Sequence, residues 1–180
     1  MKRPILIFGL IAGGIVSVFM ATSMAIGSCM HDDSFYDIGM VIGYASMLIA
    51  FSFIFIGVKS YRDKHLGGSI TFGKAFFSGL VIAFVASTMY VVTWAIEYNL
   101  FMPDFMDKYA AHMIEGAVAS GKTAAEIQQM TGEMNDMKEM YSNPVLFTLF
   151  TYVEILPVGL LITLISAVIL RKKPAGEVVV

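Results

Sequence analysis

Residues 145–170 read VLFTLFTYVEILPVGLLITLISAVIL, an apolar run that contains a single ionisable side chain, Glu154. A transmembrane helix needs about 20 mostly apolar residues to cross roughly 30 Å of hydrocarbon. In lipid the backbone amides and carbonyls have to pair within the segment, and the run lacks the alternation of a membrane β-strand. The sequence therefore predicts a membrane-spanning helix here, with one carboxyl group inside it.

Three further stretches have similar length and apolar character, at residues 5–26, 38–58 and 75–96. Of the 180 residues, 57% are hydrophobic and 14% are charged, against roughly 45–50% and about 25% in a soluble domain. This composition excludes a disordered chain and a coiled coil, and the single cysteine excludes a disulfide scaffold. We expect one all-α domain over residues 1–180, an integral membrane antiparallel four-helix bundle embedded in the lipid bilayer.

Lys and Arg gather on one side of this four-span thread, and positively charged loops are retained in the cytoplasm. The other side contains the acidic connection between the first and second spans and an acidic segment, 97–143. The sequence therefore predicts that the N-terminus and the C-terminus are both cytoplasmic. Nine of the twelve basic residues lie on the predicted cytoplasmic side: Lys2, Arg3, Lys59, Arg62, Lys64, Lys74, Arg171, Lys172 and Lys173.

Residues 102–143 are more polar than the spans, and they fit two helices. We expect an extracytoplasmic helical hairpin here, between the third and fourth spans. Asp104 has the position of an N-cap for its first helix, and Thr123 with Glu126 has the form of a capping box for its second. Asn143, followed by proline, is expected to end the hairpin and begin the fourth span.

The hairpin contains a sequence that matches a phosphate-binding loop. Residues 116–123 read GAVASGKT, which fits the pattern G-x-x-x-x-G-K-[ST]. That pattern binds phosphates only where a strand delivers the glycine-rich turn to a helix N-terminus, and here a helix is predicted on both sides. We interpret Gly121 as the hairpin turn, and we expect no cofactor and neither a nucleotide nor a nucleic acid as a partner.

Methionine is concentrated in the same segment. Met130, Met134 and Met137 lie three and four residues apart, and His112 is on the same predicted side of the membrane. Thioether and imidazole ligands suit Cu(I). The same spacing is typical of an apolar helix face, in which methionine is a flexible filler. The apolar face is the preferred interpretation, and soft-metal binding is kept as an alternative.

Cys29 closes the sequence IGSC at residues 26–29, which is similar to the cysteine-ended cleavage box of bacterial lipoprotein precursors. Lipid attachment at Cys29 is therefore one interpretation, and an ordinary cysteine at a helix end is the other.

At the far end of the third span, Tyr90, Trp94 and Tyr98 follow one another at intervals of four residues. Amphipathic rings favour the membrane interface, so we expect this row to lie there.

Every predicted span carries small residues at intervals of four, the spacing that lets helix backbones approach each other in lipid. Such rows either form a dimer face or seal a single bundle, and the presence of a row in all four spans favours the single bundle. The residues expected to mediate this packing are Gly9, Gly13, Ser17, Gly39, Gly43, Gly79, Ala83 and Gly159.

Glu154 is the main candidate for a functional side chain, because an ionisable group inside a membrane is costly and is by default a hypothesis for a functional site. Pro157 follows one turn later and favours a kink beside the carboxyl group. Either Glu154 makes a neutral hydrogen bond between helices, or it serves a proton relay or a ligand. Hydroxyl groups at comparable depth could be its partner: Ser17, Ser46, Ser87, Thr88 and Thr151.

The loop between the second and third spans, with its flanks, reads GVKSYRD at 57–63 and GGSITFGKAF at 67–76. This sequence, the order of the spans, the acidic insert and the ending at 159–173 are similar to a bacterial family of membrane proteins, domain-of-unknown-function family 4199. The resemblance implies a four-span protein of the bacterial inner membrane and brings no known activity or catalytic residue. The loop residues that carry it are Lys59, Tyr61, Arg62, Gly68, Phe72 and Lys74.

No Ser/His/Asp arrangement, zinc-spaced histidine cluster or intramembrane carboxylate pair is visible in the sequence, so we do not expect an enzyme. The preferred hypothesis is a structural, assembly or envelope-associated protein. It would form a homo-oligomer or bind a membrane-protein partner. The alternative is a proton- or solute-coupled transport component that uses Glu154.

Overall fold

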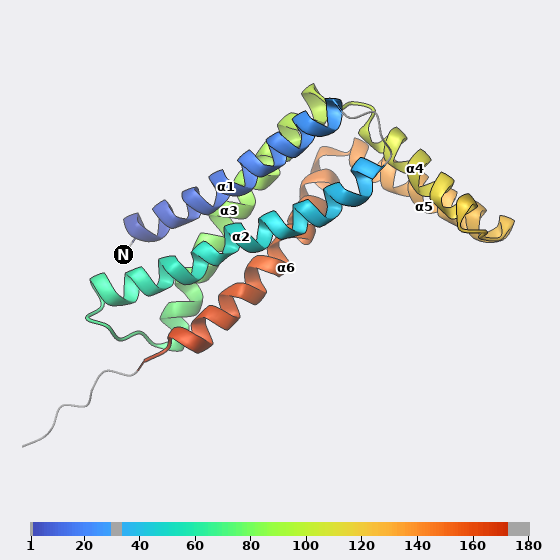
Figure 1. Ribbon diagram of the computed structural model, residues 1–180. Coiled ribbons are helices and arrows are strands. Elements are labelled where there is room, and N and C mark those ends of the chain that lie inside the picture. The colour runs from blue at the N-terminus through green and yellow to red at the C-terminus, as the bar shows by residue number, and fades with distance from the viewer. Residues whose placement is uncertain (1, 30–33, 173–180) are drawn as a thin grey trace, which may run out of the picture.

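The computed structural model describes residues 2–29 and 34–172, and in these ranges the chain is almost entirely helical (Figure 1). Four helices form an elongated bundle, and two shorter ones form a hairpin that turns aside from one end of it. We call that end of the bundle the hairpin end and the opposite end the loop end. The helices are α1 (Lys2–Cys29), α2 (Ser34–His65), α3 (Phe72–Leu100), α4 (Phe105–Ala119), α5 (Ala124–Ser142) and α6 (Pro144–Leu170).

Helices α1, α2, α3 and α6 are each long and apolar enough to cross a membrane. Their outward faces carry large exposed apolar side chains, including Leu10, Phe84 and Leu161. Exposed apolar area on this scale marks a surface that water does not cover. The protein is therefore a multi-pass membrane protein. The prediction of an all-helical four-helix bundle, with a helical hairpin between the third and fourth spans, is confirmed.

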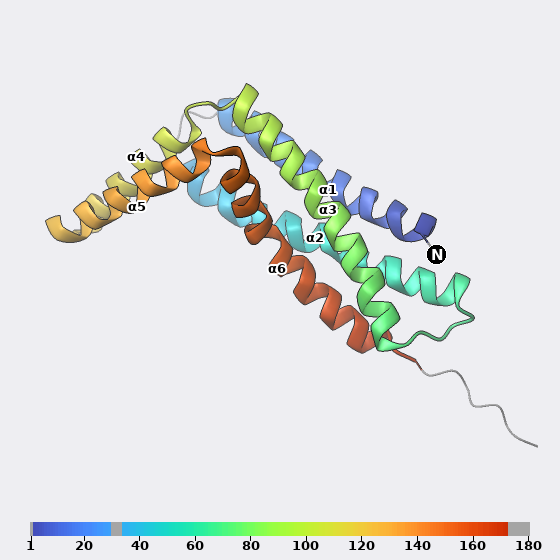
Figure 2. The ribbon, with the colours of Figure 1, turned by 180° about the vertical axis from the view of Figure 1, so that it is seen from behind.

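Consecutive spans run in opposite directions, as expected (Figures 1 and 2). The most extensive contact, however, joins α1 to α3, which run in the same direction, and α6 also packs mainly on α3. Two glycines explain the close approach of α1. A Cβ atom added to Gly9 would lie 2.8 Å from Val85 Cβ, and one added to Gly13 would lie 2.8 Å from Met89 Cβ.

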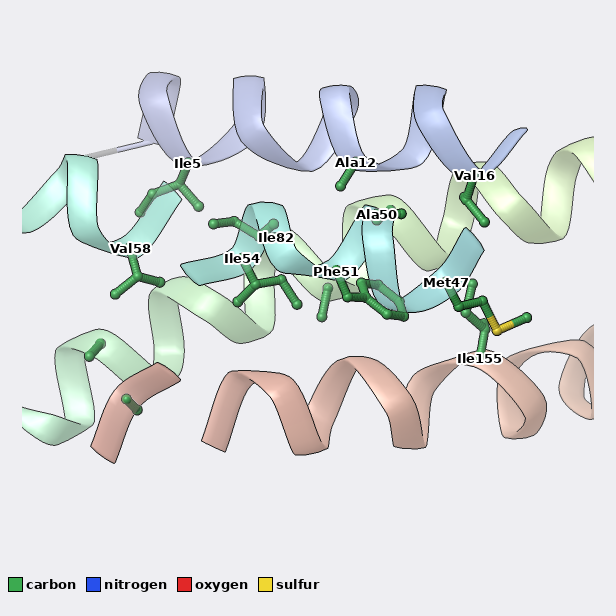
Figure 3. Packing of buried hydrophobic residues seen from close by; sticks show 14 of the residues in the cluster. Ile5, Ala12, Val16, Met47, Ala50, Phe51, Ile54, Val58, Ile82 and Ile155 are labelled. Carbon is green, nitrogen blue, oxygen red and sulfur yellow. The ribbon is translucent and has the colours of Figure 1, made fainter. Parts of the chain in front are cut away.

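The core of the bundle combines large apolar side chains with small residues that face them (Figure 3). Phe51 and Ile54 of α2 and Ile155 of α6 are fully buried. A Cβ on Gly79 would lie 2.9 Å from Thr163 Cγ2, and Gly159 faces Phe51 and Ala83. Dense packing of this kind lets dispersion contacts hold helices together in lipid, where the hydrophobic effect contributes little.

The other residues expected to mediate packing have different surroundings. Ser17 accepts a hydrogen bond from Thr93 Oγ1 at 2.8 Å, which joins α1 to α3. Gly43 does not mediate close packing, because a Cβ built on it would meet nothing within 4 Å. Gly39 and Cys29 lie outside the residues whose side chains the structure describes. The predicted lipid attachment at Cys29 therefore also falls outside them.

The hairpin has one predicted cap and lacks another. Thr123 N–H donates to Glu126 Oε2 at 2.8 Å, and Glu126 N–H donates back to Thr123 Oγ1 at 3.4 Å, so the capping box is confirmed. Asn143 Oδ1 accepts from Val145 N–H at 2.9 Å and begins α6 as predicted. Asp104 has the N-cap position of α4 but makes no side-chain cap, because its backbone (φ −93°, ψ 8°) is not in the extended conformation of a capping residue.

Candidate functional site

A cavity of about 340 Å³ lies at the hairpin end, where all six helices contribute to its wall. The bundle helices supply most of the wall, and α4 and α5 border the cavity on the hairpin side. The lining is largely aromatic and methionine side chains. The described residues that border it are Phe19, Met20, Ser23, Met24, Gly43, Tyr44, Ser46, Met47, Tyr90, Trp94, Phe105, Met106, Tyr109, Met137, Tyr141 and Glu154.

Glu154 supplies the one carboxyl group among these lining residues, and no lysine, arginine or histidine accompanies it there. Its side chain is not packed into the helical core but is accessible at the cavity. The Tyr90 hydroxyl on α3 donates a hydrogen bond to Glu154 Oε1 at 3.5 Å. The carboxyl group is thus held toward α3 by one long hydrogen bond and keeps capacity to accept more.

The hydroxyl groups that the sequence suggested as partners of Glu154 are placed differently. Those of Ser46 and Thr151 donate to carbonyl oxygens of their own helices, at 2.7 and 2.8 Å. Thr88 Oγ1 is hydrogen-bonded to Tyr152 Oη at 2.8 Å. Ser87 Oγ is buried without a hydrogen-bond partner in the described part of the chain. The observed partner, Tyr90, is a residue that the sequence assigned to another role.

Tyr90 and Trp94, which the sequence predicts at the membrane interface, are buried at the hairpin end of α3. Only 8% of Tyr90 and 7% of Trp94 is exposed, and both border the cavity. Tyr141, a residue of the hairpin, borders the same cavity. Burial, and after it the nearby Glu154 carboxylate, raises the pKa of the Tyr141 phenol to about 12. Fourfold spacing indicated a shared face, but the hairpin that covers this face could not be placed from the sequence.

Pro157 lies in the interior of α6, one turn after Glu154. Proline has no backbone N–H, so it cannot bond the carbonyl four residues earlier, which belongs to Val153. Helix α6 changes direction between the hairpin and the loop end (Figure 2). The break in hydrogen bonding thus lies next to the carboxyl group that borders the cavity.

The methionines of the hairpin are divided between its interior and the cavity. Met134 is buried, whereas Met137 borders the cavity together with Met106 of α4. Met130 and His112 are partly exposed and are not among the cavity residues. No group of three or more histidine, cysteine, aspartate or glutamate residues in the described ranges could hold a metal ion. Soft-metal binding through methionine stays an untested prediction.

The residues of the family-like loop sequence, 57–63 and 67–76, occupy the loop end, at the opposite end of the bundle from the hairpin (Figure 1). Gly68 has φ +83°, and its N–H donates to the Arg62 carbonyl at 3.0 Å, which ends α2. The Arg62 guanidinium donates to the Leu170 carbonyl at 3.3 Å. Ile70 and Lys172 exchange two backbone hydrogen bonds of 3.0 and 2.9 Å. The loop thus attaches the end of α6 to the α2–α3 connection.

The remaining loop residues are divided between core and surface. Tyr61 is buried, and its ring lies 5.9 Å from that of His65. Lys59 and Lys74 are exposed, and Phe72 is 38% exposed at the start of α3.

Residues 7–172 match the family described as "Protein of unknown function (DUF4199)". The chain belongs to this family. The match includes the loop at the loop end and every cavity residue named above, Glu154 among them. The resemblance seen in the sequence is therefore confirmed. No curated protein and no solved structure matches this DUF4199 protein.

Proposed function

We propose that this DUF4199 protein binds a small, largely apolar ligand in the cavity at its hairpin end. The observation that carries the proposal is the cavity itself, about 340 Å³ in volume and walled by apolar side chains around one carboxyl group. Ligand sites are typically cavities of about 300–1,000 Å³ with apolar linings and a few placed polar groups. The carboxyl of Glu154 and the hydroxyl of Tyr90 are such groups.

We also propose that the hairpin end faces away from the cytoplasm, in the inner membrane of a bacterium. Nine of the twelve basic residues support this orientation, because they belong to the termini and to the loop end. The test is a cysteine placed at the hairpin turn, Ser120→Cys, in a Cys29→Ser background. A membrane-impermeant maleimide should label it in intact cells, whereas Ser60→Cys, on the loop side of α2, should react only after lysis. The reverse pattern would overturn the orientation.

Ligand binding can be tested with a variant that fills the cavity without disturbing the bundle. Gly43 borders the cavity, and a Cβ on it meets nothing within 4 Å. A leucine at this position should therefore occupy the cavity. Gly14 is also open around its Cβ but is not among the cavity residues, so Gly14→Leu is the matched control.

Trp94 is the one tryptophan of the chain and borders the cavity, so its fluorescence reports on occupancy. The protein is purified in a maltoside detergent and titrated with twelve-carbon amphiphiles of positive, zero and negative head-group charge. At least one amphiphile should change the Trp94 emission saturably in the unaltered protein and in Gly14→Leu, but not in Gly43→Leu. The absence of any saturable change in the unaltered protein would overturn the proposal.

Proton- or solute-coupled transport would use the same cavity and Glu154. If the ligand crosses the membrane, proteoliposomes should show a flux that depends on pH and that Glu154→Gln abolishes. Binding without flux would instead identify a protein that holds or presents its ligand. Neither role requires a chemical reaction, and we propose that the protein is not an enzyme.

The hairpin supports the assembly hypothesis independently of the cavity. It extends sideways beyond the bundle (Figures 1 and 2), and most of its α5 residues are exposed. Such a projection is accessible to a second protein or a second copy. Affinity purification in mild detergent should recover a stoichiometric partner, and charge substitutions at the exposed Gln128 and Asn135 should release it. Recovery that is unchanged by these substitutions would contradict a role for the hairpin.

A further inference from the structure

The cavity combines one carboxyl group with aromatic rings, and none of the described residues that line it is cationic. Tyr44, Tyr90, Trp94 and Tyr141 border it together with Glu154. Aromatic rings attract cations through their electron-rich faces, and sites for organic ammonium groups are built from such rings. We infer that the cavity takes an organic ammonium ion carried on an apolar body, with Glu154 as its counter-charge. This inference rests on the proposed ligand-binding function and names the class of the ligand.

The hydrogen bonding of Glu154 is consistent with a ligand of this charge. Tyr90 donates one hydrogen bond, at the long distance of 3.5 Å. An ionised carboxylate accepts through two oxygens and about four lone pairs. An ammonium group at the cavity would therefore find an accessible acceptor with no protein cation beside it. An anionic ligand would meet a carboxyl group and no positive side chain among the described lining residues.

The volume distinguishes an organic ion from a metal ion or a proton. A water molecule occupies about 30 Å³ of liquid, so a bare cation would leave most of the 340 Å³ unfilled. The rest of the wall suits an apolar body. Met47, Met106 and Met137 border the cavity, and methionine side chains adapt their shape to an apolar surface.

Two sources can supply an ammonium group on an apolar body. One is the head group of a membrane lipid such as phosphatidylethanolamine, and the other is a free amphiphilic amine. Both present the same chemistry to Glu154 and the aromatic rings. They differ in whether the ligand arrives from the bilayer, so an experiment can separate them.

The first arm of the test compares three probes in maltoside micelles: dodecyltrimethylammonium, dodecanol and dodecyl sulfate. Each is titrated while the Trp94 fluorescence is followed. The ammonium probe should bind the most tightly, and Glu154→Gln should weaken it by about tenfold or more, since a charged partner is lost. Binding of dodecanol should change little in this variant. Glu139→Gln, an exposed acid of α5 outside the cavity, is the matched control and should behave like the unaltered protein.

The second arm adds phosphatidylethanolamine or phosphatidylglycerol to the micelles before the ammonium probe. Competition by phosphatidylethanolamine alone identifies a lipid head group as the source, and the absence of competition identifies a free amine. Both results support the inference if the probe itself depends on Glu154.

The outcomes separate this inference from the function on which it rests. If the three probes bind equally and Glu154→Gln has no effect, while Gly43→Leu still abolishes binding, the cavity is a ligand site but its ligand is not an ammonium ion. If no probe binds at all, the proposed function itself fails. Should Glu154→Gln not fold, Glu154→Asp retains the charge with a shorter reach, and it should weaken the ammonium probe more than dodecanol. Equal effects on the two probes would overturn the inference.

Discussion

The Tyr90 hydroxyl on α3 donates a hydrogen bond to Glu154 Oε1 on α6, at 3.5 Å. The two residues are 64 positions apart in sequence, and the whole hairpin is inserted between them. This hydrogen bond joins the carboxyl group of the cavity to α3. Helix α3 makes the most extensive contacts in the bundle, with α1 and with α6.

The same pair of helices has a second hydrogen bond, which should be the stronger one. Thr88 Oγ1 and Tyr152 Oη are 2.8 Å apart. Thr88 donates its single hydroxyl hydrogen to the Phe84 carbonyl, also at 2.8 Å, so Tyr152 is the donor to Thr88. The Tyr152 ring also stacks on Phe84.

Double-mutant cycles should rank these two hydrogen bonds. Interhelical hydrogen bonds in membranes contribute about 0.6 kcal/mol on average and about 1.7 kcal/mol at most. We expect the coupling free energy between Thr88→Val and Tyr152→Phe to exceed that between Tyr90→Phe and Glu154→Gln, because the first bond is shorter. The measurement is reversible unfolding in mixed micelles. A larger coupling for the Tyr90–Glu154 pair would contradict the ranking.

Gly9 should be intolerant of even one added methyl group. An alanine Cβ there would lie 2.8 Å from Val85 Cβ, a branched carbon that cannot rotate away. Overpacking of this kind costs about 1–3 kcal/mol. Gly14→Ala is the control, because its Cβ meets nothing within 4 Å. It should leave stability unchanged or raise it by up to about 1 kcal/mol through helix propensity. Equal unfolding free energies for the two variants would refute close packing of α1 on α3.

Gly68 should be required for the connection between α2 and α3. Its φ of +83° is unfavourable for residues with a Cβ and should make Gly68→Ala destabilising by roughly 1–2 kcal/mol. Gly73→Ala, at the start of α3 with open space around it, should cause no loss. Thermal unfolding in detergent is the measurement. If Gly68→Ala is as stable as Gly73→Ala, the turn does not hold the conformation described.

Tyr141 should make stability depend on pH in the alkaline range. Its folded-state pKa of about 12 is above the ordinary value of about 10, so the folded protein favours the neutral phenol. The stabilisation is complete below pH 10 and is lost as the pH rises from about 10 toward 12. The unfolding free energy of the unaltered protein should therefore fall more steeply in this range than that of Tyr141→Phe. Parallel curves would show that Tyr141 is not buried as described.

The capping box of α5 should weaken at low pH. The hydrogen bond from Thr123 to the Glu126 carboxylate lowers the pKa of that carboxyl group. The contribution of the cap is therefore present above the ordinary glutamate pKa, near 4.3, and is lost as the pH falls through the lower folded value. The protection factors of the first amides of α5, which correct for the intrinsic pH dependence of exchange, should fall there. Thr123→Ala should already lower these protection factors at neutral pH. Protection that does not change with pH would contradict the role of Glu126.

The sequence by itself determined the elements that depend on local chemistry. Apolar length defined the four spans, because a lipid-exposed backbone has to be helical. The capping box and Asn143 marked helix starts, since each satisfies amides within a few residues of itself. Glu154 stood out because an acid inside an apolar run is rare.

Tertiary structure alone decided what Glu154 meets. The cavity draws residues from all six helices, so no segment of the sequence contains its pattern. The sequence predicted interfacial rings at Tyr90 and Trp94 but could not show that they line a cavity, because the direction in which α4 and α5 leave the bundle depends on long-range packing. The same packing made α1 and α3 neighbours through Gly9 and left Gly43 open at the cavity. Local pattern specifies which face a residue occupies, and only the assembled helices specify what lies opposite that face.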